Sequence, residues 1–95
     1  MRKIRLTGRE AKVVRTIGFA LALPGAEIME ITKLEPEDLT DVLNGLMTVG
    51  FVECAPYADQ VSVEAMPATE FEVNSAYTHE LKTSLGLGGG RERRR

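Results

Sequence analysis

The pattern that most constrains the fold lies in residues 35–53, "EPEDLTDVLNGLMTVGFVE". Apolar residues recur there at i, i+3, i+4, i+7 and i+8, the spacing of one face of an α-helix. They are Leu39, Val42, Leu43, Leu46 and Met47. Pro36 suits the first helical position, because its missing N–H would have no partner there, and Gly50 suits the C-terminal cap. We therefore predict a helix from Pro36 that ends before Gly50 and runs into a strand at Phe51.

Two further helices are predicted upstream. Thr7 and Glu10 have the spacing of a capping box, so the first helix begins near Gly8 and continues until Pro24 and Gly25 stop it. Its inward face carries Val13, Val14, Ile17, Ala20 and Leu21. Residues 26–32 form a shorter helix whose anchors are Ile28, Met29 and Ile31, followed by a turn at Lys33 and Leu34. Ahead of these helices, residues 3–6 ("KIRL") alternate in the manner of a short strand.

The second half of the chain reads as β structure followed by one helix. Three short segments have the residue pattern typical of strands, namely residues 51–57, 61–65 and 69–73. Either a tight turn at residues 58–60 joins the first two segments, or a long connection over residues 57–68 lets the third segment pair with the first. Asn74 or Ser75 caps a last helix, in which Tyr77, Leu81 and Leu85 recur every four residues.

Composition indicates one small domain in an intracellular, cytoplasmic setting. The chain has 95 residues, of which 43% are hydrophobic and 27% charged, and its single cysteine allows no internal disulfide. No targeting or membrane segment is recognisable, because no apolar run is long enough. Residues 1–85 form the predicted domain, and residues 86–95 have the composition of a flexible Gly/Arg-rich tail.

Charge is strongly segregated along the chain. Up to Arg15 there are six basic residues against one acid, whereas residues 26–80 contain twelve acids and only one basic residue, Lys33. The tail contains four arginines and one glutamate. An acidic body with two basic ends constrains the choice of partner, although it says nothing about the fold.

The run from residue 27 to residue 53 resembles the winged helix-turn-helix of bacterial transcription regulators. The matching features are Ile28 and Met29 on the supporting helix, Leu34 in the turn, Val42, Leu43 and Leu46 on the third helix, and Gly50, Phe51, Val52 and Glu53 entering the wing. The resemblance implies an α+β winged helix with a short N-terminal strand, three helices, a β-hairpin wing and a C-terminal helix. It also implies a DNA-binding regulator whose third helix lies in a major groove.

The charges point away from that use of the third helix. Its outward side carries Glu37, Thr40, Asp41, Asn44 and Thr48, with Asp38 nearby. Lysines and arginines dominate DNA affinity because they neutralise phosphates. If DNA is bound, we expect the basic N-terminal region to supply the affinity. The candidate DNA-binding residues are Arg2, Lys3, Arg5, Arg9, Lys12, Arg15, Lys33 and Asn44.

The alternative function is a winged-helix protein-interaction or dimerisation module that does not bind DNA. On the predicted first helix, Phe19 and Leu23 fall on the side opposite the core stripe, where large apolar groups need a cover. They could meet the stripe on the last helix, within one chain or across the two-fold axis of a homodimer. The candidate interface residues are Phe19, Leu23, Tyr77, Leu81 and Leu85.

Enzyme chemistry, cofactors and metals are not expected. One cysteine, Cys54, and one histidine, His79, fall short of a zinc site, and the carboxylates are dispersed along exposed faces. The glycines after Leu85 do not form a phosphate loop, because no strand precedes them and the lysine-serine ending is absent. We therefore predict no catalytic residues.

Overall fold

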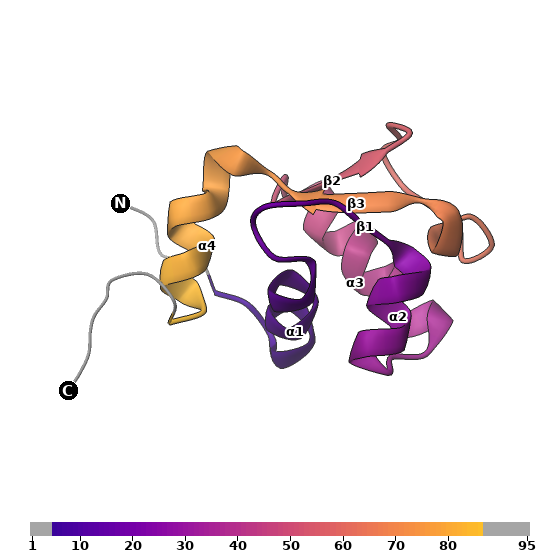
Figure 1. Cartoon of the computed structure of the whole chain (residues 1–95), viewed down its shortest axis with the longest axis horizontal. Coiled ribbons are helices and arrows are strands. Elements are labelled where there is room, and N and C mark those ends of the chain that lie inside the picture. Colours follow the sequence, from indigo (N-terminus) through magenta and orange to yellow (C-terminus); the bar gives the residue numbers. More distant parts are fainter. Residues whose placement is uncertain (1–4, 87–95) are drawn as a thin grey trace.

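The computed structural model describes residues 5–86 of the chain. Within this range it is α+β, as predicted, with four α-helices and one three-stranded antiparallel sheet. The elements in chain order are α1 (Gly8–Ile17), β1 (Leu23–Pro24), α2 (Gly25–Thr32), α3 (Pro36–Thr48), β2 (Val52–Ala55), the 3-10 turn η1 (Met66–Ala68), β3 (Glu70–Val73), the 3-10 turn η2 (Ser75–Tyr77) and α4 (Thr78–Ser84). In Figure 1 the first three helices lie on one side of the sheet, and α4 lies at one end of the molecule.

Helix α1 starts where the capping box predicted and stops earlier than predicted. The Thr7 hydroxyl accepts a hydrogen bond from the Glu10 N–H at 3.2 Å, and the Glu10 carboxylate accepts one from the Thr7 N–H at 2.9 Å. The helix ends at Ile17, followed by Gly18 with φ 75°, a conformation that glycine adopts without a Cβ clash. Residues 18–23 therefore leave the helix, and the prediction that Ala20 and Leu21 point inward was wrong, since Ala20 is exposed and Leu21 is 76% exposed.

Helices α2 and α3 occupy their predicted positions, joined by a turn in which Lys33 adopts φ 64°. On α2, Ile28 is fully buried, but the predicted anchor Ile31 is 54% exposed. The inward position of that turn is taken instead by Thr32, whose hydroxyl donates to the Ile28 carbonyl at 2.8 Å. A buried threonine with its hydroxyl satisfied inside the helix fits the core, and this is why an apolar pattern alone misplaced Ile31.

On α3 the predicted apolar stripe is confirmed at Leu39, Leu43 and Leu46, which are buried. Val42 and Met47 flank it and are half-buried. These residues face the rest of the core and hold α3 against the sheet and α1.

The sheet resolves the pairing that the sequence left open. Strand β2 pairs with β3, with Cys54 opposite Phe71, so the long connection is correct and residues 61–65 do not form a strand. The third strand is β1, with Leu23 on the other side of Phe71. The predicted strand over residues 3–6 falls partly outside the described residues, and Arg5 and Leu6 do not belong to a strand.

The core is built from all four helices and from β2, η1 and β3. Phe71 on the central strand is its largest fully buried side chain. The buried apolar residues are Val13, Val14, Ile17, Ile28, Leu39, Leu43, Leu46, Val52, Met66, Phe71, Val73, Leu81 and Leu85. Burial of Leu81 and Leu85 ties α4 to the remainder of the fold. Of the predicted tail, only Gly86 lies within the described residues.

Candidate interaction surfaces

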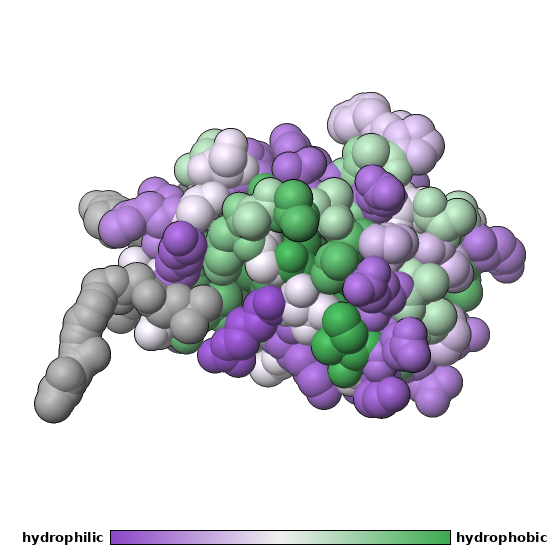
Figure 2. All heavy atoms as spheres, in the orientation of Figure 1, coloured by the Kyte–Doolittle hydropathy of each residue, from purple (hydrophilic) through white to green (hydrophobic). Residues whose placement is uncertain are grey.

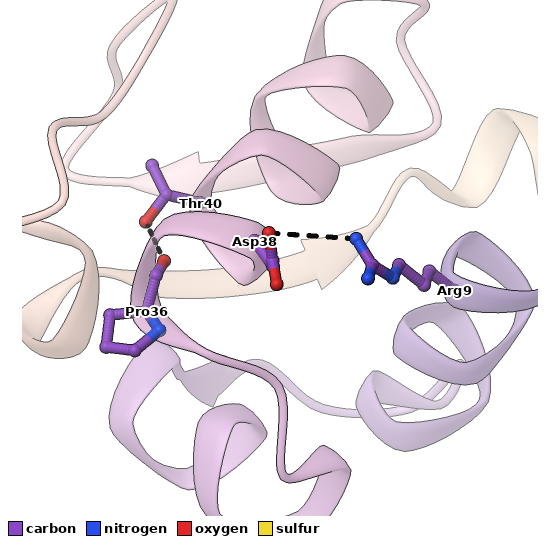
Figure 3. A network of polar contacts seen from close by, with 4 residues as sticks. All are labelled: Arg9, Pro36, Asp38 and Thr40. Atoms are coloured by element: carbon purple, nitrogen blue, oxygen red, sulfur yellow. Dashed lines mark hydrogen bonds and ion pairs between the residues drawn. The ribbon is translucent and has the colours of Figure 1, made fainter.

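The outer face of α3, where the resemblance places DNA contacts, is acidic at its N-terminal end. Glu37 and Asp41 are exposed and Asp38 is half-buried. Thr40, which the sequence placed on this outer face, is buried, and its hydroxyl donates to the Pro36 carbonyl at 2.7 Å (Figure 3). Thr40 is buried because it lies next to Leu39, at the edge of the apolar stripe of α3. Thr40 is therefore not available to a partner of this face.

Farther along α3, the connection between β2 and β3 folds back over the same face. The Asn44 amide nitrogen donates to the Val61 carbonyl at 3.0 Å, and the Asn44 oxygen accepts from the Val61 N–H at 2.8 Å. One turn on, the Gln60 amide donates to the Thr48 hydroxyl at 3.1 Å. Asn44 thus pairs with the backbone of Val61 as a neighbouring strand would. We call the three hydrogen bonds, two between Asn44 and Val61 and one between Gln60 and Thr48, the α3 clamp. Reading adenine would require the same amide nitrogen and oxygen.

Replacing Asn44 by alanine is expected to lower the free energy of unfolding by about 1–3 kcal/mol, because the half-buried Val61 N–H and C=O both lose their partner. Urea unfolding followed by circular dichroism measures this loss. Thr48→Ala leaves the Asn44–Val61 pair in place and removes two exposed hydrogen bonds, to the Asn44 carbonyl and from the Gln60 amide; it is the control and should stay within about 0.5 kcal/mol of wild type. Hydrogen exchange at the Val61 amide should accelerate in Asn44→Ala alone. Unchanged protection there would mean that the clamp does not hold the connection in solution.

Within residues 5–86, the basic residues predicted to contact DNA lie ahead of α1, on α1 and in the α2–α3 turn, and two of them contact other parts of the chain. Arg9 on α1 lies 3.7 Å from the Asp38 carboxylate at the start of α3, an exposed ion pair visible in Figure 3. Arg15 donates to the Leu85 carbonyl at 3.3 Å and so secures the end of α4. Lys12 is exposed on α1, and Lys33 is exposed in the α2–α3 turn. Arg5 is also exposed, whereas Arg2 and Lys3 lie outside the described residues.

The predicted interface residues lie within or against the chain's own core. Leu81 is fully buried and Leu85 nearly so, while Leu23 forms part of β1. The Tyr77 ring packs edge-on against Phe51, with ring centroids 5.1 Å apart. Tyr77, Leu81 and Leu85 therefore pack against other residues of the same chain, which is the first of the two arrangements considered for this stripe.

Phe19 is half-buried, and the Lys82 ammonium lies 5.4 Å from its ring centroid. Phe19 therefore meets α4, but from the segment after α1 and not from the helix itself. In Figure 2 apolar side chains gather over this α1–β1 connection, which includes the exposed Leu21.

A cleft that sequence reasoning missed lies between β2, the end of α3 and residues 57–60. It encloses about 390 Å³. Its lining residues are Met47, Thr48, Gly50, Val52, Glu53, Cys54, Tyr57, Ala58, Asp59, Gln60 and Asn74. No linear motif marks it, because it forms only when the β2–β3 connection folds back.

The rim of this cleft is shaped by Tyr57, Asp59 and Cys54. The Tyr57 hydroxyl donates to the Asp59 carboxylate at 2.8 Å, and this hydrogen bond together with the negative charge raises the pKa of Tyr57 above its usual value. The Tyr57 residue as a whole is 83% exposed. The Cys54 sulfur lies 3.5 Å from the carbonyl oxygens of both Pro56 and Ala58 and donates to this turn. The rim is thus held by its own side-chain contacts.

Among residues 5–86 no group of three or more His, Cys, Asp or Glu side chains is placed to hold a metal ion. In the same range no helix is both long and apolar enough to cross a membrane.

The fold and these surfaces define a class, a small α+β domain in which a helix–turn–helix pair leads into an antiparallel sheet. This class is compatible with a winged helix. Comparisons of the chain with protein-family models, with curated proteins and with solved structures gave no match.

Proposed function

We propose that this chain is a winged-helix regulatory module that binds another protein and does not read DNA with α3. Three features support the winged-helix assignment. Helices α2 and α3 are joined by a tight turn, α3 runs through Gly50 into β2, and the long β2–β3 connection occupies the position of a wing. The order of elements agrees with the resemblance in the sequence with one exception. The additional strand, β1, lies between α1 and α2, whereas the resemblance implies a strand ahead of α1.

The α3 clamp is the observation that carries the proposal. A recognition helix reads bases with side chains that are free to enter the groove. Here Asn44 is paired with Val61, and Thr48 is paired with Gln60. A helix that approached a major groove with this face would have to displace the connection first.

Charge supports the same conclusion. The exposed carboxylates of Glu37 and Asp41 would be repelled by the negatively charged phosphates of DNA. The nearby Arg9 is paired with Asp38. Such a face repels DNA but complements a basic protein surface.

DNA contact through α1 is the second candidate. Arg5 and Lys12 are exposed, and the side chain of Arg9 keeps 59% exposure within its ion pair. In this arrangement α1 would contact phosphates while α3 stays out of the groove. Binding would then depend on backbone charge and not on base sequence.

Fluorescence anisotropy of a labelled generic duplex separates the two candidates. We expect no anisotropy change at low salt up to roughly 100 μM protein, a range in which non-specific DNA-binding proteins associate readily. Binding that weakens steeply with salt would contradict the protein-interaction proposal. If that binding also disappears when Arg5, Arg9 and Lys12 are replaced by glutamine, the α1 candidate is correct. If it persists in that variant, another surface of the chain contacts DNA.

A further inference from the structure

Strand β2 is an edge strand whose second side faces the cleft. Within residues 5–86 the sheet order is β1-β3-β2, so β2 pairs with β3 alone. Residues 57–60 return alongside β2 across the cleft, yet they form no ladder with it. An unpaired strand edge is a template for adding another strand.

The register identifies which backbone groups face the cleft. The Asn74 N–H donates to the Phe51 carbonyl at 2.8 Å, and Phe51 and Asn74 are opposite each other by continuation of the Val52–Val73 pair. In an antiparallel ladder, pairs that exchange hydrogen bonds alternate with pairs that do not. Glu53 and Ala55 therefore direct their N–H and C=O groups at β3, whereas Val52 and Cys54 direct theirs away from it.

Val52 and Cys54 both line the cleft, and no backbone partner for either residue on this side lies among residues 5–86. Val52 is buried and Cys54 half-buried, which makes an unpaired N–H or C=O there unfavourable. Cys54 is the more accessible of the two. It offers one donor and one acceptor to an incoming extended backbone.

The side chains around the cleft select a positive charge. Glu53 and Asp59 contribute carboxylates, and no lysine or arginine is among the lining residues. Tyr57 adds an exposed aromatic ring that is held by its hydrogen bond to Asp59. Carboxylates beside an aromatic face attract ammonium and guanidinium groups.

We propose that an extended, basic segment of a partner protein adds to the free edge of β2. Its backbone pairs with Cys54, and an arginine or lysine side chain enters the cleft between Glu53 and Asp59 and beside Tyr57. This inference rests on the proposed protein-interaction function and names the chemistry of the partner. Backbone pairing supplies affinity, and the acidic cleft supplies selectivity for a basic side chain.

The test uses the full chain and a fluorescein-labelled peptide of eight residues that alternates arginine and threonine. We expect saturable binding by anisotropy, and a shift of the Cys54 amide resonance in ¹⁵N NMR spectra. The same peptide with N-methyl groups on alternate backbone nitrogens keeps its charge but loses strand donors. It should bind at least about ten-fold more weakly.

A matched pair of charge variants tests the cleft itself. Glu53→Gln combined with Asp59→Asn should weaken peptide binding about ten-fold. Glu27→Gln combined with Glu30→Gln removes two exposed acids from α2 and changes the net charge equally, so it should have little effect. Equal weakening in both variants would mean that only the overall charge attracts the peptide, which overturns the proposal.

Other results also overturn it. These are no binding at millimolar peptide, equal affinity for the N-methylated peptide, or resonance shifts that leave Cys54 unmoved. A Cys54 amide that moves with protein concentration in the absence of peptide would assign the edge to a second copy of the chain instead. If the peptide fails while the duplex also shows no binding, only the strand-addition proposal falls. If the duplex binds, the protein-interaction function falls whatever the peptide does.

Discussion

Replacing Leu81 by alanine is expected to lower the free energy of unfolding by about 2–5 kcal/mol, the usual range for truncating a fully buried leucine. Leu81 has no exposed surface, and it anchors α4 to the core together with Leu85. Helix α4 has seven residues, too few to be stable without such packing. For a domain of this size the loss is a large part of the total stability, which is typically about 5–15 kcal/mol.

Urea unfolding followed by far-UV circular dichroism measures this effect, and Leu21→Ala is the matched control. The same side chain is removed there from a position that is 76% exposed, so the change should stay within about 0.5 kcal/mol of wild type. The pair also tests the dimer alternative, since sizing of the folded protein should give the same mass for both variants. A Leu81→Ala protein of normal stability but altered oligomeric state would show that Leu81 belongs to an interface between chains.

Gly25→Ala is expected to destabilise the protein by about 1–3 kcal/mol or more, because the added methyl group has no room. A Cβ at Gly25 would overlap the carbonyl oxygen and the sulfur of Met66. The sulfur can rotate away, but the carbonyl cannot move freely, since it accepts from the Thr69 N–H at 3.2 Å. The Gly25 N–H is itself bonded to the Thr69 carbonyl at 2.8 Å, which holds α2 close to η1.

The control for this substitution has the opposite expected sign. A Cβ at Gly45, inside α3, would meet nothing within 4 Å. Gly45→Ala should therefore stabilise the protein by about 0.5–1 kcal/mol, the difference in helix propensity. Both values come from the same urea titrations. Equal and small effects at the two positions would mean that α2 does not approach η1 as closely as described.

The periodicity of α3 illustrates what can be predicted from sequence alone. Leu39, Leu43 and Leu46 are buried as predicted, and the helix begins at Pro36. The capping box of α1 and the turn between α2 and α3 were also predicted correctly. Each of these features depends on residues within a few positions of one another, so local spacing contains the information. The acidic character of the outer α3 face is likewise readable directly from the chain.

Errors arose where the outcome depended on residues far apart in sequence. Leu21 continued the helical pattern of α1, but Gly18 ends the helix and Leu23 pairs with Phe71, forty-eight positions away. Residues 61–65 have a strand-like pattern, yet the N–H and C=O of Val61 form hydrogen bonds with the Asn44 side chain of α3 and not with a strand. A strand-like pattern indicates that a segment can pair, not which partner it finds.

The sequence by itself determined the α+β class, the main helices and an acidic third helix on a body flanked by basic ends. Only the tertiary structure decided that Leu81 and Leu85 lie in the chain's own core, that Asn44 is paired with Val61, and that β2, at the edge of the sheet formed by residues 5–86, borders a cleft lined by Glu53 and Asp59. The physical reason is that helix formation follows from local periodicity, whereas burial and hydrogen-bond pairing depend on which distant segments come into contact.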